Sequence, residues 1–308
     1  MPQTFYEVVW IFIIYAFIGW CTEVSYAALD RGKFVNRGFC NGPYCPIYGF
    51  GVLIVVVLLT PLKENLIILF LGSFLLTTLL EYITGYILEK VFHNKWWDYS
   101  DKPFNLHGYI CLKFSIMWGL ACSFIMLIIH PIIIGFVRMI PKTLGIIILS
   151  VVMAAFAADC IVTISTILKF NKRLKGMNEV AAKLKVISNE IGENIYENVS
   201  DVIEKKEILD NTYEEIRTDF AQKKEKFAEN VENRYQKLND SVQLNREKKR
   251  AEYQELSQKY KELTEKKIYG HDRLLKAFPG MKSVDYEDSL LKLREHLKKI
   301  VKNKKELR

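Results

Sequence analysis

Uncharged stretches long enough to cross a lipid bilayer dominate the first 168 residues of this chain. Only 19 charged residues interrupt that part, whereas 59 of the last 140 residues are Asp, Glu, Lys or Arg, with no Trp or Cys among them. Lipid offers no partner for exposed backbone polar groups, so each crossing stretch has to form a helix. The sequence therefore predicts an all-α fold: a polytopic membrane helix bundle followed by a long helical tail in water.

The uncharged stretches predict five transmembrane helices. A helix needs about 20 residues to cross a hydrocarbon core of about 30 Å. Four of the stretches reach that length directly, and the second does so only by borrowing residues from the uncharged segment that begins at Gly38. The five stretches are Phe5–Ala28, Ile47–Leu62, Leu66–Leu88, Phe114–Val137 and Thr143–Leu168.

Basic residues in the connecting loops predict the orientation of these helices. One side of the predicted bundle carries Arg31, Lys33, Arg37, Lys90, Lys95, Lys102, Lys113, Lys169, Lys172, Arg173 and Lys175, and the other side carries only Lys63, Arg138 and Lys142. Cytoplasmic loops are the ones enriched in Lys and Arg. We therefore expect a multi-pass membrane protein with its N-terminus outside and its tail in the cytoplasm.

Apolar residues in the tail recur three and four positions apart. This narrow stripe, with charges of both signs around it, predicts a cytoplasmic coiled coil over 169–270; a lone charged helix or a flexible tail is the alternative. The stripe needs a covering surface, either a second copy, which we favour as a parallel homo-oligomer, or residues 212–269 folded back on 172–210. The segment Asp210-Asn211-Thr212, followed by Glu215, resembles a capping box at which the helix could break.

The chain changes character again after Gly270. Phe278-Pro279-Gly280 is a turn signal, and an amphipathic helix follows it with Leu290, Leu293, Leu297 and Ile300 on one face. We expect this helix either to fold back on the rod or to dock on a partner. The predicted domains are therefore 1–168, 169–270 and 271–308.

Three acidic residues, Glu23, Glu81 and Asp159, interrupt the predicted spans, all in the cytoplasmic half. A carboxylate in lipid is costly, so such groups face the bundle interior, a water-filled cavity or a partner. One interpretation is a site for a cation or a proton relay. The other is structural, in which they pair with Arg31, Lys33 or Arg37 or cap helix ends.

Both predicted inner loops are rich in Gly, Pro, Asn and Trp. The glycines and prolines of residues 38–51 are typical of a re-entrant segment or of a rigid connector. The second loop holds Trp96 and Trp97, which membrane proteins often use as interfacial anchors. Asn36, Arg37, Trp97, Asp98 and Asn105 are the polar and aromatic residues that we place near the acidic site.

These loops and the third span contain several motifs that occur in a fixed order: Asn36-Arg37-Gly38-Phe39, Gly42-Pro43, Pro46-Ile47-Tyr48-Gly49-Phe50-Gly51, Glu81-Tyr82, Trp96-Trp97-Asp98-Tyr99 and Phe104-Asn105-Leu106. Together they resemble a bacterial integral-membrane family, the Putative ABC-transporter type IV permeases (CmpB-like), which implies a location in the bacterial cell membrane. The resemblance covers roughly residues 10–165 and leaves out the tail. At one place the chain departs from the family pattern: His107-Gly108-Tyr109-Ile110 stands where the family continues Asn-Gly-Arg-Ile.

The resemblance implies a transporter-like, non-enzymatic membrane component. The chain has no phosphate-binding loop ending in Gly-Lys-Ser/Thr, so a separate subunit would have to supply an ATPase. No cofactor, metal site or nucleic-acid partner is predicted, since the cysteines lack metal-ligand spacing and the tail mixes both charge signs. The alternatives are a membrane-anchored coiled-coil scaffold, or an enzyme acting on lipid or cell-wall precursors.

Overall fold

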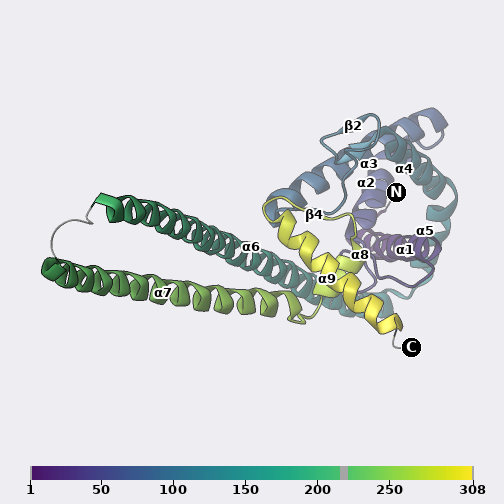
Figure 1. The fold of residues 1–308 in the computed structure, drawn as a ribbon. Helices are drawn as coiled ribbons and strands as arrows, with labels where there is room; N and C mark the ends of the chain where they lie inside the picture. The colour runs from purple at the N-terminus through teal and green to yellow at the C-terminus, as the bar shows by residue number, and fades with distance from the viewer. Residues whose placement is uncertain (1, 216–220, 307–308) are drawn as a thin grey trace. The chain divides into compact units, whose positions relative to one another are not determined.

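The computed structural model describes residues 2–215 and 221–306. The chain divides into two compact units. The first unit combines Met1–Leu174 with Lys267–Arg308, and the second is Lys175–Lys266 (Figure 1). The all-α prediction is confirmed, since the only strands among the described residues are four of two residues each.

Among the residues that the structure describes, four helices are long and apolar enough to cross a membrane. They are α1 (Phe5–Arg31), α3 (Leu66–Phe92), the continuous span of α4 (Leu112–Phe124), η2 (Ile125–Ile129) and α5 (His130–Met139), and the first part of α6 (Lys142–Glu215). Pro131 explains the π-helical turn η2, because its ring nitrogen cannot donate to the carbonyl four residues earlier.

The second predicted span is shorter than expected. Helix α2 covers Pro46–Leu59 and is extended only by the 3-10 turn η1 (Thr60–Leu62). The expectation that this helix would borrow residues from Gly38 onward is wrong, because residues 38–45 contain no helix. Pro46 sets the first turn of α2, where a missing N–H leaves no helical hydrogen bond unmade.

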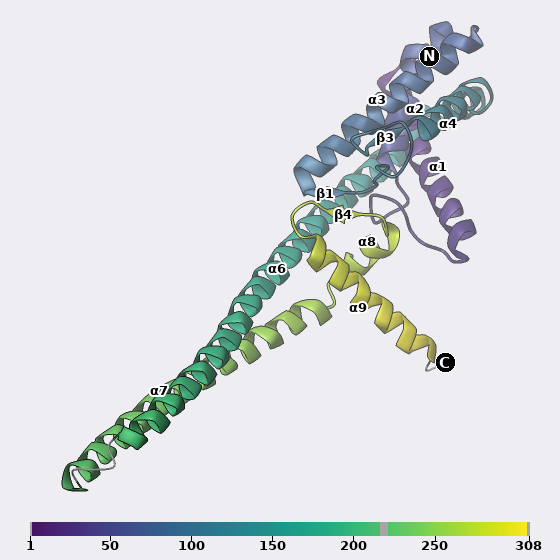
Figure 2. The same cartoon turned by 45° about the horizontal axis from the view of Figure 1, so that its top comes forward.

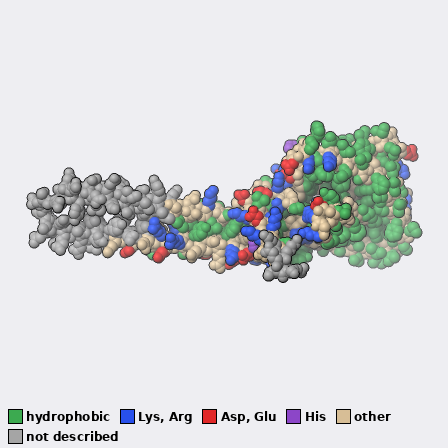
Figure 3. Space-filling model, turned by 45° about the vertical axis from the view of Figure 1, so that its right-hand side comes forward, with side chains coloured by type: hydrophobic (Ala, Val, Ile, Leu, Met, Phe, Trp, Pro, Cys, Tyr) green, Lys and Arg blue, Asp and Glu red, His purple; other side chains and the backbone are tan. Residues whose placement is uncertain are grey.

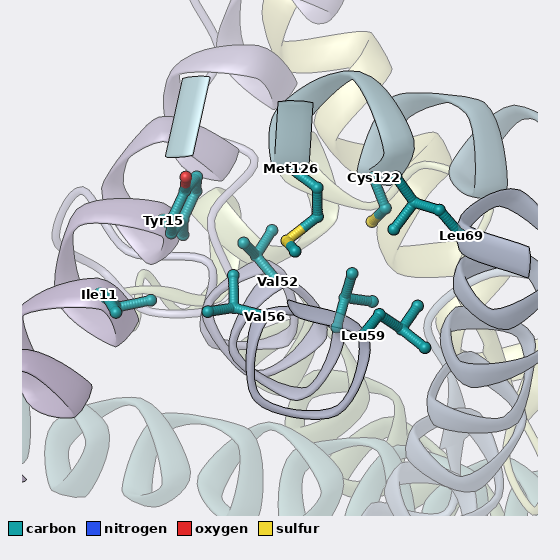
Figure 4. Close-up of a cluster of buried hydrophobic side chains, with 9 residues drawn as sticks. Ile11, Tyr15, Val52, Val56, Leu59, Leu69, Cys122 and Met126 are labelled. Carbon is teal, nitrogen blue, oxygen red and sulfur yellow. The ribbon is translucent and has the colours of Figure 1, made fainter. Parts of the chain in front are cut away.

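Buried aliphatic side chains hold α1, α2, α3 and the α4–α5 span together (Figure 4). Ile11, Val56 and Leu69 are completely buried, although each comes from a different helix. Outward-facing positions are also apolar, as in Leu71, Leu75 and Leu79 of α3. In Figure 3 hydrophobic side chains cover most of the visible face of these helices, which is the surface that contact with lipid requires.

The second unit consists of two helices that run antiparallel. They are the part of α6 that begins at Lys175, and α7 (Ala221–Glu265) (Figure 2). Gly176 lies beside Leu263, and Lys249 forms an ion pair of 2.9 Å with Glu190. Helix α6 continues through Asp210 to Glu215, without the break suggested by the capping-box pattern, and residues 216–220, including Ile216 and Phe220 of the stripe, lie outside the described residues.

This hairpin gives the apolar stripe a partner inside the same chain. Met177, Val180 and Ile187 of α6 are buried. The arrangement corresponds to the fold-back alternative of the sequence analysis. The parallel homo-oligomer stays a prediction, but the argument for it weakens, because part of the stripe is already covered.

The C-terminal segment, defined here as residues 267–308, does not fold back on the rod, whereas its docking on a partner stays a prediction. It belongs to the first unit and packs on the loops of the membrane helices. It contains α8 (His271–Ala277), β4 (Lys282–Ser283) and α9 (Glu287–Glu306). Strand β4 pairs antiparallel with β1 (Asn94–Lys95), while β2 (Asn105–Leu106) pairs with β3 (Ile110–Cys111) within the second inner loop.

Candidate functional site

Residues 32–45 return into the helix bundle before α2 begins. The backbone N–H of Cys45 donates to the carbonyl oxygen of Ala16, near the midpoint of α1, at 2.9 Å. Glycines allow this approach: Gly19 packs on the ring of Tyr48, and Gly49 packs on the backbone of Phe12. Of the two interpretations of this loop, the structure favours the re-entrant segment.

In the re-entrant segment, defined here as residues 36–45, side chains satisfy several of the polar backbone groups. The carboxylate of Asp159 accepts the N–H groups of Asn41 (3.0 Å) and Gly42 (2.7 Å). The Asn36 side chain accepts from the indole of Trp20 and from the N–H of Gly38, and it donates to the carbonyl of Asn41. Irregular backbone at membrane depth is stable only with such partners.

The contacts of Glu23 agree with the structural interpretation, in which the acid pairs with a basic residue. Its carboxylate accepts a hydrogen bond of 2.6 Å from the hydroxyl of Tyr48 and pairs with Arg37 at 3.3 Å. Arg37 also lies over the ring of Tyr26. Glu23, on α1, is therefore a partly exposed, paired acid beside the first turn of α2.

Glu81 is the most buried of the three acids, with 8% of its surface exposed. One carboxylate oxygen accepts a hydrogen bond of 3.3 Å from Tyr99, and the other, Oε2, is buried without a hydrogen-bond partner in the described structure. Phe114 stacks on the Tyr99 ring. A buried carboxylate oxygen without a partner is costly, so Glu81 is the strongest candidate for a residue that takes up a proton or a cation.

Two of the three acids converge and the third does not. Tyr99 donates a hydrogen bond to Glu81 and lies within electrostatic range of Glu23, and Tyr48 donates to Glu23 and lies within electrostatic range of Tyr99. Asp159 instead interacts with the re-entrant segment and with Arg273 of the C-terminal segment. We call Glu23, Tyr48, Glu81 and Tyr99 the acid–tyrosine cluster.

The other predicted site residues shape the second loop. The indole of Trp97 donates to the carbonyl of Tyr109, and Asn105 donates to the carbonyls of Ser100 and Lys102. Asp98 accepts from Ser100 and from Lys282. Burial raises the pKa of Asp98, but the hydrogen bonds from Lys282 and Ser100 outweigh it and hold this pKa at about 2. The hydrogen bonds of these three side chains stay within the second loop and with Lys282, so they do not join the cluster.

The described residues contain no group of three or more His, Cys, Asp or Glu that could hold a metal ion. All six cysteines are free thiols, and the sulfur atoms of Cys40 and Cys160 lie 3.8 Å apart. Cys40 and Cys45 are both buried. Burial among packed side chains makes both of these cysteines small packing residues.

His271 is completely buried where α8 meets α6. It faces the ring of Phe170 and the guanidinium of Arg173, with Lys169, Asp272 and the backbone of Thr166 nearby. Burial and then Arg173 lower the pKa of His271 to about 4. The imidazole is therefore neutral while the C-terminal segment is docked.

We expect docking of the C-terminal segment to weaken on acidification. The undocked imidazole takes up a proton near pH 6.5, its ordinary pKa, whereas the docked imidazole does so only near pH 4. Docking is therefore strongest above pH 6.5. It should weaken about tenfold per pH unit between these values. The line shape of a nitroxide at Val284, recorded in a His93→Asn background that removes the contact to Asp285, would report this. His271→Gln should flatten the profile, and a pH-independent line shape with His271 present would contradict the prediction.

Sequence reasoning missed three residues of this region: Tyr48, Tyr99 and Arg273. Both tyrosines belong to motifs already singled out, and a tyrosine beside a membrane acid could have been recognised as its hydrogen-bond donor. No local signal distinguishes Arg273 from the other basic residues of the tail.

A family model described as Putative ABC-transporter type IV matches residues 10–164, which include the whole acid–tyrosine cluster and Asp159. No curated protein and no solved structure gives a significant match.

Proposed function

Because the chain belongs to the Putative ABC-transporter type IV family, we propose that it is a membrane-spanning component of a transport system. In this proposal a separate subunit supplies the ATPase, and the acid–tyrosine cluster binds the transported cation or relays a proton. The observation that supports this most directly is the buried Glu81 carboxylate with one oxygen lacking a partner.

Physical chemistry supports the cluster as the transport site. Interrupted helices near the bilayer midplane are where many transporters bind substrates, because unwound backbone and helix ends can coordinate ions there. Here α2 starts beside the midpoint of α1, and Tyr48 in its first turn hydrogen-bonds to Glu23. Two carboxylates and two hydroxyls suit a cation or a cationic group better than an anion.

We further propose that the chain resides in a bacterial cell membrane, with the two inner loops and the hairpin in the cytoplasm. The excess of Lys and Arg on that side supports this orientation. The acid–tyrosine cluster would then lie in the cytoplasmic half of the bundle.

A membrane-anchored scaffold is the second candidate function. The hairpin of residues Lys175–Lys266 favours it, because a unit of this size outside the membrane helices provides a surface for partners. In this alternative the bundle only anchors the hairpin, and Glu81 has no role beyond packing.

Glu81→Gln separates the two candidates. The substitution keeps the size and one acceptor but removes the charge, so we expect transport-dependent growth of a complemented deletion strain to fall at least about tenfold, the effect of losing one charge-assisted interaction. Glu64→Gln, an exposed acid between η1 and α3, is the matched control and should behave as wild type.

A second variant tests the scaffold directly. In it a Gly-Ser linker replaces residues 175–266, and membrane levels and folding are matched by quantitative blotting and gel filtration. If Glu81→Gln complements fully while the linker variant does not, the transport site is refuted and the scaffold function remains. Loss of complementation by Glu81→Gln alone supports the transport proposal.

A further inference from the structure

Three consecutive carbonyl groups of the re-entrant segment point at one guanidinium. Nη1 of Arg273 donates to the carbonyl oxygens of Gly38 (2.9 Å) and Cys40 (3.0 Å), and Nη2 donates to that of Phe39 (3.2 Å). Arg273 comes from α8, in the C-terminal segment of the chain. We call the carbonyls of Gly38, Phe39 and Cys40 the carbonyl cradle.

The three carbonyl groups of the re-entrant segment need hydrogen-bond donors, which a guanidinium can supply. The N–H groups of the segment at Asn41 and Gly42 are satisfied by Asp159, whereas the three preceding carbonyls have no helical or strand partner. Buried carbonyls without donors cost free energy. The planar guanidinium offers several donors in a fixed plane and can satisfy all three at once, whereas an ammonium group has a different donor geometry.

Arg273 also lies in a favourable electrostatic environment. Asp159 attracts its charge and opposes the effect of burial, which lowers the pKa of Arg273. The carbonyl cradle and Asp159 together thus form a surface suited to a flat cation. Cys40, which contributes one of the carbonyls, is completely buried.

Two other polar side-chain contacts of the C-terminal segment are more exposed. Lys282 pairs with Asp98 at 2.6 Å with more than half of the lysine side chain exposed, and Arg31 donates to the carbonyl of Lys276. Exposed ion pairs contribute little, so of the three basic side chains in these contacts Arg273 holds the segment most strongly. The segment is also held by the buried His271, by the pairing of β4 with β1, and by Phe278, which packs edge-on against Trp96.

We propose that the carbonyl cradle is a guanidinium-binding site, which Arg273 fills, and that this contact makes the C-terminal segment a latch on the re-entrant segment. Once Arg273 is removed, the cradle accepts a free guanidinium ion. This inference concerns binding and docking, and it stands whether or not the acid–tyrosine cluster transports anything.

The rate at which Cys40 is alkylated in the purified full-length protein reports whether the C-terminal segment is docked on the re-entrant segment. We expect Arg273→Ala to raise the rate at which a maleimide modifies Cys40 by at least about tenfold, because the loop loses a charged hydrogen-bond partner. Peptide mass spectrometry separates Cys40 from the other cysteines. Cys122, buried in the cluster of Figure 4, reports on unfolding and should react equally slowly in both proteins.

Guanidinium chloride at about 50 mM, far below the molar range in which it unfolds proteins, is the chemical test of the cradle. It should return Cys40 of Arg273→Ala to near the wild-type rate, whereas equal concentrations of sodium or ammonium chloride should not. Lys276→Ala removes an exposed charge from the same helix and serves as the matched control, with a wild-type rate expected throughout.

Two results would overturn the proposal. Wild-type alkylation of Cys40 in Arg273→Ala would show that Arg273 is no anchor, and an increase that sodium chloride reverses as well as guanidinium would show that the cradle does not recognise the guanidinium. If Arg273→Ala does not fold, Arg273→Lys replaces it. Lysine keeps the charge without the planar donors, so an intermediate rate supports the cradle and a wild-type rate contradicts it.

Discussion

Gly49→Ala is expected to disrupt the packing of α1 on α2 and to destabilise the folded bundle strongly. A Cβ at position 49 would lie 2.6 Å from the carbonyl oxygen of Phe12 and 2.8 Å from its ring. The carbonyl belongs to the backbone of α1, so it cannot rotate away, and the two helices would have to separate. Overpacking of this kind costs about 1–3 kcal/mol or more.

The matched control for this substitution lies on the same helix. A Cβ at Gly51 would meet only the end of the Leu80 side chain at 3.4 Å, an ordinary contact, so Gly51→Ala should be tolerated. Thermal unfolding followed by gel filtration in detergent would compare the two variants. Equal apparent Tm values for Gly49→Ala, Gly51→Ala and wild type would show that α1 and α2 do not approach each other this closely.

Asp159→Ala is expected to produce the second large effect. The substitution leaves the N–H groups of Asn41 and Gly42 without their acceptor inside the bundle. Each unsatisfied buried donor costs about 1–3 kcal/mol, so the combined loss is on the order of 2–6 kcal/mol if water does not enter. Lower yield of folded protein and faster proteolysis of the first inner loop would report it.

Asp159→Asn distinguishes the effect of losing the hydrogen-bond acceptor from the effect of losing the negative charge. Asparagine keeps one oxygen acceptor, so we expect stability between those of wild type and Asp159→Ala. Asp30→Ala, which removes a mostly exposed acid near the end of α1, should have no comparable effect. If Asp159→Ala is as stable as wild type, the carboxylate does not hold the re-entrant segment, and Asp159 returns as a candidate site residue beside Glu81.

The sequence could identify single residues of the candidate site but not which of them lie together. Glu23, Glu81 and Asp159 stand out because acids are rare in apolar spans. Their depth along each helix follows from position in the sequence, but the helix face that they occupy in the packed bundle does not. Packing decides which partner each acid has. Tyr48 donates to Glu23 and Tyr99 donates to Glu81, whereas the backbone N–H groups of Asn41 and Gly42 donate to Asp159.

Hydropathy and periodicity by themselves determined the all-α class and four stretches long enough to cross a membrane as helices. They also determined the change from apolar to charged composition at about residue 168. These are local properties, because solvent and backbone hydrogen bonding act on each segment separately. Only the tertiary structure decided that α2 begins beside Ala16, that α6 and α7 pair within one chain, and that Arg273 reaches the carbonyl cradle. An apolar stripe needs an apolar surface to cover it, and a buried basic side chain needs hydrogen-bond acceptors. The sequence shows these needs, but the packing of distant segments determines which surface meets them.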